Sequence, residues 1–182
     1  MQAEDVRVRE ELAKEGVLTE GYEPRMDAVH RRNAERLGAI VGEHGWPGRG
    51  LVGDDGAEAA WQTLQHAVGR PDLMRGHLPL LQQAAAQGEV PEWHPAYVLD
   101  RIRFFEGRPQ VYGTQYDVDE EGFSSLWPVE DPDGVNERRK KVGLPPLAAN
   151  ARSRLHKPLS PAQVKARREA GEAWARAVGW RD

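Results

Sequence analysis

The stretch that decides the fold runs from Pro24 to Glu43 and reads PRMDAVHRRNAERLGAIVGE. Its apolar residues recur close to every 3.6 positions, which is the period of an amphipathic α-helix. Proline suits a first helical turn because its missing N–H is not needed there. The apolar face consists of Met26, Val29, Leu37, Ile40 and Val41. Asn33 falls on that same face, so a buried Asn33 needs hydrogen-bond partners, either in the fold or in a ligand.

Further helices are predicted on both sides of this stretch. They are expected over about 3–15, 55–68, 70–87 and 91–106, within 131–142, and from Ser160-Pro161 onward. Asp55 and Glu58 have the spacing of a capping box, with Asp55 as the N-cap. Residues 44–53 are rich in Gly and Pro, so we expect a loop there.

The hydrophobic period changes to two after residue 110, which indicates β-structure. Polar and apolar residues alternate over Gln110–Val118, with Tyr112 and Thr114 on one face. Asp119–Gly122 has the composition of a turn, and the residues after it can return as a second strand. We therefore expect one small antiparallel β-hairpin over about 110–129.

A chain of 182 residues, 39% of them hydrophobic, can bury one modest core. The expected fold class is mainly α: a compact helical domain with the hairpin over residues 1–147, then a basic C-terminal extension over 148–182 that ends in a helix packed on the body. No apolar run approaches the about 18–20 residues of a membrane span, and the acidic start at Met1 does not resemble a secretory signal. We therefore expect a cytoplasmic protein that does not enter a membrane. The absence of Cys excludes disulfides and thiol chemistry.

Positive charge is concentrated near the C-terminus. Residues 138–168 contain ten Lys or Arg and no Asp or Glu, whereas residues 1–137 carry a net charge of −13. This basic segment can bind an external anion, such as an acidic protein partner, or fold back on the acidic body of its own chain. The second interpretation is favoured because an intramolecular partner is always at hand. Nucleic acid is not expected, since the segment has no aromatic side chain to stack on bases.

An acidic residue interrupts the aromatic stripe of the helix expected over 91–106. Asp100 falls between Tyr97 and Phe104 on one face, and Arg101 lies on its flank. The opposite face is also apolar, so we expect the helix to be central and Asp100 to be at least half buried. A buried carboxylate must be paired or protonated, and Arg101 or another Arg is the expected partner. The pair either belongs to an active site or is a structural ion pair that holds the hairpin or a loop.

The helix expected over 55–68 carries polar side chains along one side. Glu58, Gln62 and His66 are spaced four residues apart, and Gln65 flanks the apolar stripe. If the hairpin covers this side, His66 is the natural general acid–base group, because the ordinary pKa of His is about 6.5. If the side faces solvent, it is an ordinary polar surface, and Glu58 is only a cap.

Metal and phosphate sites are not favoured by the sequence. The six His are scattered without a His-x-x-x-His pair, so no metal is expected. A set that folding could still assemble consists of His44, His66, His94 and Asp100. The loop 44–53 has no Lys after its glycines, which argues against a phosphate site. No cofactor is expected either.

Several blocks of the sequence together resemble a known family. They are Asn33–Pro47, Leu51–Ala67, Ala96–Arg101, Gln110–Gln115, Glu137–Arg139 and Val142–Pro146. Over about residues 25–147 the chain resembles the bacterial domain of unknown function 6624. This resemblance implies no particular reaction. The residues that it singles out are Asn33, His44, Trp46, Pro47, Gln65, His66, Asp100, Arg101, Gln110, Tyr112, Gly113, Thr114 and Gln115.

Together these patterns predict a small-molecule enzyme of the hydrolase, cyclase or lyase type, without cofactor or metal. The expected catalytic residues are His66 as general acid–base, Asp100 and Tyr112. The expected substrate-binding residues are Asn33, His44, Gln65, Arg101, Gln110, Thr114 and Gln115. Strand alternation sends Gln115 to the opposite side from Thr114 unless a bulge lies near Gly113. The alternative is a non-catalytic protein that binds an acidic partner through residues 138–168.

Overall fold

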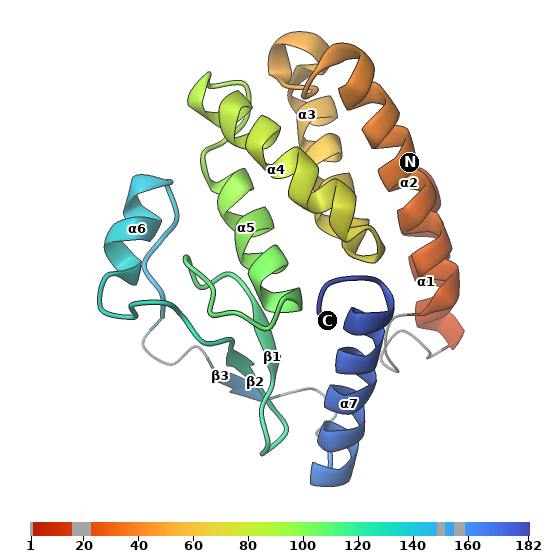
Figure 1. The fold of residues 1–182 in the computed structure, drawn as a ribbon, viewed down its shortest axis with the longest axis vertical. Coiled ribbons are helices and arrows are strands. Elements are labelled where there is room, and N and C mark those ends of the chain that lie inside the picture. The colour runs from red at the N-terminus through yellow and green to blue at the C-terminus, as the bar shows by residue number, and fades with distance from the viewer. Residues whose placement is uncertain (1, 16–22, 149–151, 155–158) are drawn as a thin grey trace. The chain divides into compact units, whose positions relative to one another are not determined.

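The computed structural model describes residues 2–15, 23–148, 152–154 and 159–182. The chain divides into two compact units, Met1–His94 and Pro95–Asp182. The described residues form seven α-helices and a small antiparallel sheet, so the expected mainly α class is confirmed (Figure 1). None of these helices is long and apolar enough to cross a membrane.

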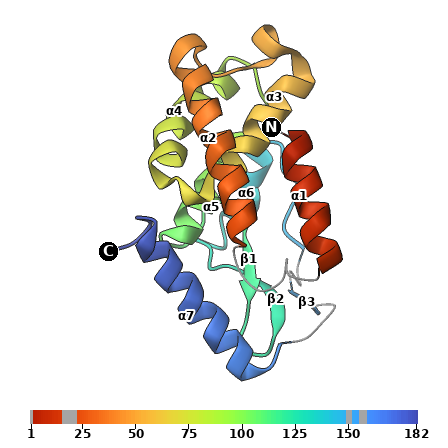
Figure 2. The same cartoon turned by 90° about the vertical axis from the view of Figure 1, so that its right-hand side faces the viewer.

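The first unit is built of helices. They are α1 (Gln2–Glu15), α2 (Pro24–His44), α3 (Arg49–His66), the short 3₁₀ helix η1 (Ala67–Gly69) and α4 (Pro71–Ala86). Helix α2 begins at Pro24, as the sequence predicts. Helices α1 and α2 lie side by side (Figure 2). A cluster of buried apolar side chains joins them, formed by Val8, Leu12, Met26 and Val29.

Helix α3 begins earlier than the sequence predicts. The expected loop over 44–53 is wrong in its second half, because α3 starts at Arg49. Glu89 holds this first turn: its backbone carbonyl accepts the N–H of Arg49 at 3.0 Å, and its carboxylate accepts the N–H of Gly50 at 2.7 Å. The helix then kinks at Gly53, where φ is +73°, a value that glycine tolerates. The glycines of this stretch therefore lie in a kinked helix, and not in the open loop that the sequence predicts.

The capping box expected at Asp55 is also wrong. The N-cap of α3 is Gly48, seven residues earlier. Glu58 instead accepts a hydrogen bond from Nε2 of Gln62 at 3.1 Å. Its other carboxylate oxygen lies 3.1 Å from Nε2 of His94, whose side chain is buried. Glu58 is thus part of a side-chain cluster and does not cap the helix.

The second unit combines helices with a three-stranded antiparallel sheet. Its elements are α5 (Trp93–Phe105, which starts just before the boundary), β1 (Tyr116–Val118), β2 (Phe123–Leu126), α6 (Val135–Lys141), β3 (Arg152–Arg154) and α7 (Pro161–Ala177). Strands β1 and β2 form the expected hairpin, and the carboxylate of Asp119 accepts backbone N–H groups in its turn. Strand β3 pairs with β2 and was not expected from the sequence.

The hairpin is shorter than the expected 110–129. Its first strand starts at Tyr116, and residues 110–115 form a loop that begins with an isolated parallel β-bridge between Gln110 and Val129. Gly113 in this loop has a φ of +70°, which lies outside the strand region. Three backbone N–H groups of the loop converge on the carboxylate of Asp100, so the chain turns around Asp100 instead of extending. The strand predicted from Gln110 onward is therefore wrong for the residues before Tyr116.

The last helix packs within the second unit. Ser160 caps α7 and Pro161 stands in its first turn, as the sequence predicts. Beyond the helix, the ring of Trp180 stacks on that of Phe105, with centroids 5.5 Å apart. Nε of Arg181 donates to the backbone carbonyl of Phe105 at 2.7 Å. These contacts fix the C-terminal end of the chain on α5.

Basic side chains of residues 138–168 contact oxygen atoms of the second unit. Arg138 and Arg139 on α6 donate hydrogen bonds to backbone carbonyls. Arg167 and Arg168 on α7 lie within 3.8 Å of carboxylates. The structure does not describe Lys157 or the side chains of Arg152 and Arg154.

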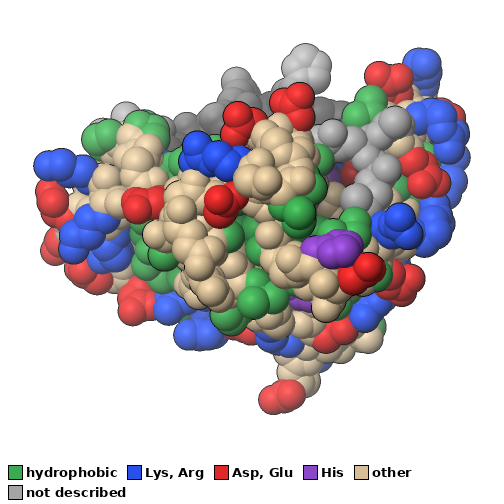
Figure 3. All heavy atoms as spheres, turned by 90° about the horizontal axis from the view of Figure 1, so that it is seen from above, with side chains coloured by type: hydrophobic (Ala, Val, Ile, Leu, Met, Phe, Trp, Pro, Cys, Tyr) green, Lys and Arg blue, Asp and Glu red, His purple; other side chains and the backbone are tan. Residues whose placement is uncertain are grey.

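On the face drawn in Figure 3, acidic and basic side chains are interspersed. The contacts favour a segment that folds back on its own chain.

Candidate functional site

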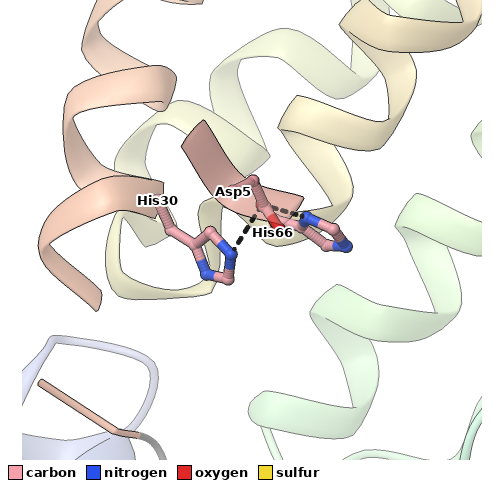
Figure 4. Close-up of side chains that lie close together, drawn as sticks. All are labelled: Asp5, His30 and His66. Carbon is pink, nitrogen blue, oxygen red and sulfur yellow. Dashed lines mark hydrogen bonds and ion pairs between the residues drawn. The ribbon is translucent and has the colours of Figure 1, made fainter. Parts of the chain in front are cut away.

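A carboxylate lies between two imidazoles in the first unit. Asp5 comes from α1, His30 from α2 and His66 from α3 (Figure 4). Oδ2 of Asp5 lies 2.9 Å from Nε2 of His30 and 3.0 Å from Nδ1 of His66. The two rings are 4.9 Å apart between centroids and are tilted by 33°. One carboxylate oxygen is therefore shared by two ring nitrogens from different helices.

Helical periodicity explains why these side chains meet. Asp5 precedes Val8 by three residues, so it shares the buried face of α1. His30 follows Met26 by four residues, which places it on the buried face of α2. His66 is the last residue of α3. Asp5 and His30 thus occupy positions where the helical pattern calls for apolar side chains.

The three groups differ in burial. The side chain of His30 is 7% exposed and that of Asp5 11%, whereas that of His66 is 36% exposed. Burial lowers the pKa of His30 to about 4, and repulsion by His66 adds to this shift. Burial alone would raise the pKa of Asp5, but the two imidazoles and Arg9 outweigh it, so this pKa lies below its ordinary value. Near neutral pH, Asp5 is therefore ionised and His30 is neutral.

Arg9 anchors the second oxygen of Asp5. Its Nη2 donates to Oδ1 at 3.2 Å from one turn further along α1. Oδ1 thus faces the guanidinium, while Oδ2 faces both imidazoles. This arrangement fixes the orientation of the carboxylate and leaves one oxygen for the two rings.

The cluster lines a hollow of about 760 Å³. The other residues that line it are Val6, Arg7, Arg9 and Glu10 on α1, Asn33 on α2, and Gln62 and Thr63 on α3. This volume lies in the range of small-molecule sites. Polar, charged and apolar side chains all contribute to its walls, so the hollow can hold a small polar molecule against the cluster.

The composition of the cluster suits two kinds of chemistry. One ligand atom from each of Asp5, His30 and His66 lies within 4.8 Å of the other two. Within the described residues, these three form the group of His, Asp or Glu side chains that lie close enough together to hold a metal ion. Two imidazoles and a carboxylate can hold a divalent transition metal. A carboxylate on one ring nitrogen can also orient a histidine for proton transfer.

Asp100 on α5 has a different environment. Its side chain is fully buried. The carboxylate accepts the backbone N–H of Val111 at 2.7 Å and those of Tyr112 and Thr114 at 3.1 Å, and the Thr114 hydroxyl donates to it at 3.0 Å. Nε of Arg101 donates to Oε1 of Gln115 at 3.2 Å, so the loop supplies four donors to Asp100 and an acceptor to Arg101.

Gln110 completes this second network. Its Nε2 donates to the carbonyls of Gln115 and Trp127, and its Oε1 accepts the N–H of Gln115 at 2.8 Å. Burial raises the pKa of Asp100 against the opposing effect of its backbone donors. Burial also raises the pKa of Tyr112, as does the nearby charge of Asp100. The network ties the loop 110–115 to α5 and to the end of the hairpin.

Comparison with known proteins identifies the family. The model of a family of unknown function, DUF6624, matches residues 2–157. The chain belongs to this family. The match is wider than the expected 25–147 and takes in α1, which carries Asp5. No curated protein and no solved structure matches this DUF6624 chain.

The DUF6624 chain brings part of the predicted site to the hollow. His66 and Asn33 both line it, and Asn33 is buried, as its place on the apolar face of α2 predicts. Gln65 is also buried on α3, but Gln62 lines the hollow in its place. His44 ends α2, where its side chain is 51% exposed.

The other predicted site residues lie in the second unit. They are Asp100, Arg101, Gln110, Tyr112, Thr114 and Gln115. Except for the half-buried phenol of Tyr112, their side chains take part in the hydrogen-bond network around Asp100. His66 belongs to the first unit. The predicted roles of these six residues in catalysis and binding stay predictions.

Sequence reasoning did not find Asp5 or His30. A signal was present for each, because Asp5 shares the helical face of Val8 and His30 that of Met26. The same argument identified Asn33, one turn after His30 on α2. The many charged residues of α1 obscure the pattern around Asp5, whereas on α2 the pattern singles out His30 as plainly as Asn33.

Proposed function

We propose that this DUF6624 protein is a small-molecule enzyme of the hydrolase, cyclase or lyase type, with His66 as its general acid–base group. The observation that carries this proposal is the 3.0 Å contact between Nδ1 of His66 and Oδ2 of Asp5 in the wall of the hollow. A carboxylate at Nδ1 holds the imidazole in one tautomer and stabilises the imidazolium that forms when Nε2 takes a proton. Asp5 thus supplies a positioning carboxylate for His66.

The lining of the hollow supports a small polar substrate. Asn33 and Thr63 bring an amide and a hydroxyl into its wall from neighbouring helices, and both residues are buried. The Thr63 hydroxyl donates to the Ala59 carbonyl at 2.8 Å, so its oxygen is left as an acceptor. Arg7 and Glu10 bring opposite charges from α1. Positively and negatively charged side chains next to buried polar residues favour a substrate with hydrogen-bonding atoms over a purely apolar one.

In this proposal Asp100 shapes the loop 110–115 and does not react. Its carboxylate oxygens accept four groups of the loop, three backbone N–H groups and the Thr114 hydroxyl. A reacting carboxylate needs an oxygen that can turn to a substrate, whereas these oxygens are held at 2.7–3.1 Å by the fold itself.

Substitution of His66 tests the proposal. The wild-type protein is first screened on activated esters, lactones, phosphodiesters and small elimination substrates. On the substrate that is turned over, His66→Gln is expected to lower kcat about 10²–10⁴-fold, the usual contribution of a general acid–base group. His77→Gln is the matched control, because His77 lies on α4 and bonds the Leu73 carbonyl outside the hollow. A kcat within twofold of wild type for His66→Gln would contradict the proposal.

The alternative function is binding of an acidic partner through residues 138–168. Lys140 and Lys141 on α6 are exposed and favour it, whereas Arg138 and Arg139 already contact backbone carbonyls. Charge reversal at Lys140 and Lys141 should then abolish a salt-sensitive complex and leave the folding of the chain unchanged.

A further inference from the structure

We propose that Asp5, His30 and His66 bind one divalent transition-metal ion, with zinc as the reference ion. A role of this ion in catalysis rests on the proposed function, because it requires the hollow to be the active site. The binding itself is measured without any substrate.

The positions of the three ligand atoms support the ion. Nε2 of His30 and Nδ1 of His66 lie 2.9 and 3.0 Å from Oδ2 of Asp5, and the three atoms fall within 4.8 Å of one another. A tetrahedral zinc ion with bonds of about 2.0–2.1 Å separates its ligand atoms by about 3.3 Å. To admit an ion in place of the two hydrogen bonds, the two ring nitrogens need to move outward from Oδ2 by a few tenths of an ångström. They also need to lie about 3.3 Å from each other, which requires an approach of at most about 1.5 Å from the 4.8 Å limit.

The choice of ligands narrows the class of ion. Imidazole nitrogen is a good ligand for zinc, iron, nickel and copper, whereas magnesium and calcium prefer oxygen atoms. Two of the three side chains here are imidazoles. A transition metal is therefore expected, and magnesium serves as the negative control.

The surroundings of the ligands resemble those of a metal site. Ligating carboxylates are usually held by a further hydrogen bond that fixes their orientation. Arg9 makes such a bond to Oδ1 of Asp5 at 3.2 Å, which leaves Oδ2 for the ion. The ligands also come from three helices that belong to one compact unit. The fold therefore sets their spacing even before an ion is bound.

The position of the three ligands in the wall of the hollow favours a catalytic ion over a structural one. Three protein ligands leave a fourth coordination position, which is the pattern of catalytic zinc sites and not of structural ones. The three ligands line a hollow of about 760 Å³, so water or a substrate oxygen can take that position. With the ion bound, His66 would be a ligand, and a water or substrate oxygen on the ion would take over the acid–base role that the proposed function gives to His66 in the metal-free protein.

Binding is tested on the untagged 182-residue chain after removal of bound metal with a chelator. Isothermal titration with Zn²⁺ is expected to give one ion per chain, and Mg²⁺ should give no saturable binding. The ligand variants His30→Gln, His66→Gln and Asp5→Asn should each weaken zinc binding at least about 100-fold, since each removes a ligand. His77→Gln is the matched control, because His77 lies on α4 and Nδ1 of its ring contacts the Leu73 carbonyl, outside the cluster. It should bind zinc within twofold of wild type.

A spectroscopic measurement on the wild-type chain keeps the test independent of how the variants fold. Co²⁺ in place of Zn²⁺ should give the visible absorption bands of a four-coordinate site, and addition of Zn²⁺ should remove them. A zinc affinity in His30→Gln equal to that of His77→Gln and the wild type would overturn the metal site.

The outcomes also separate this inference from the proposed function. If the chain binds no zinc but His66→Gln loses turnover, the metal site is wrong and the acid–base enzyme stands. If zinc binds with the expected pattern but turnover is unaffected by His66→Gln, the metal site stands and the proposed enzyme centre is wrong.

Discussion

Two buried aspartates, one in each unit, show how differently a fold can use a carboxylate. Asp100 accepts backbone N–H groups of a single loop, eleven to fourteen residues further along the chain. Asp5 faces two imidazoles from other helices, 25 and 61 residues away, and lines a hollow. The first carboxylate organises its own loop, and the second gathers titratable side chains from distant parts of the sequence.

The difference suggests a rule for reading a buried acidic residue. Backbone N–H groups belong to the fold, so a carboxylate that they satisfy is part of the architecture. Imidazoles are also metal ligands and proton carriers, so a carboxylate that holds two of them beside a hollow is equipped for chemistry. Substitution of Asp100 should therefore change stability, whereas substitution of Asp5 should change function.

The largest effect on stability is expected from Asp100→Asn. The amide keeps one acceptor oxygen but brings an NH₂ group against backbone donors, so several N–H groups of the loop lose their partner. We expect the second unit to lose about 3 kcal/mol or more of its free energy of unfolding. Urea unfolding with amide hydrogen exchange in each unit measures this loss. A loss below about 1 kcal/mol would mean that Asp100 does not organise the loop.

Acid should destabilise the first unit of the metal-free protein through His30. The pKa of His30 is about 4 in the fold and about 6.5 in the unfolded chain, so the unfolded state binds more protons between these values. Stability is therefore lost as the pH falls from about 6.5 to about 4, by up to about 3 kcal/mol. Asp5, His66 and Arg9 are among the charged or titratable groups that act on His30.

His30→Gln gives the control for this pH effect. Free energies of unfolding of the variant and the wild type are compared at steps between pH 7 and pH 4. The variant should lose less stability than the wild type over this range. Parallel pH profiles for the two proteins would show that His30 keeps its ordinary pKa in the fold.

A smaller effect is expected from Gly113→Ala. The φ of +70° at this position strains any residue with a side chain, and an added Cβ would lie 2.8 Å from Cδ1 of Leu147. Leu147 can shift, so the backbone strain dominates, and we expect a loss of about 1–2 kcal/mol from the second unit. Thermal unfolding measures it. A variant as stable as the wild type would show that the loop can form without this left-handed turn.

The smallest effect on stability is expected from Arg9→Gln. Arg9 is about half exposed, so its ion pair with Asp5 contributes less than about 1 kcal/mol to folding. The same variant should weaken zinc binding about 10-fold, because the carboxylate loses the bond that orients it. An unchanged zinc affinity in Arg9→Gln would show that Asp5 needs no such support.

Local features of the fold could be predicted from the sequence. The period of α2, the proline that begins it, the turn at Asp119 and the cap of α7 at Ser160 all depend on residues close together in the chain. The burial of Asp100 was predictable too, because an aromatic stripe surrounds it on one helix.

The features that sequence reasoning missed depend on contacts between distant residues. Asp5, His30 and His66 meet only because three helices pack together. The spacing of residues within each helix does not predict which helices pack against one another. The loop 110–115 looks like a strand by its alternation, but its N–H groups turn to Asp100, a residue on the preceding helix. Strand β3 lies far from β2 in the sequence.

The most direct test of the central claim is a crystal structure of the zinc-soaked protein, with anomalous scattering recorded on both sides of the zinc edge. We predict one anomalous peak at about 2.0–2.2 Å from Nε2 of His30, Nδ1 of His66 and Oδ2 of Asp5. Clear density for the cluster without such a peak, with both imidazoles still hydrogen-bonded to Asp5, would contradict the metal centre.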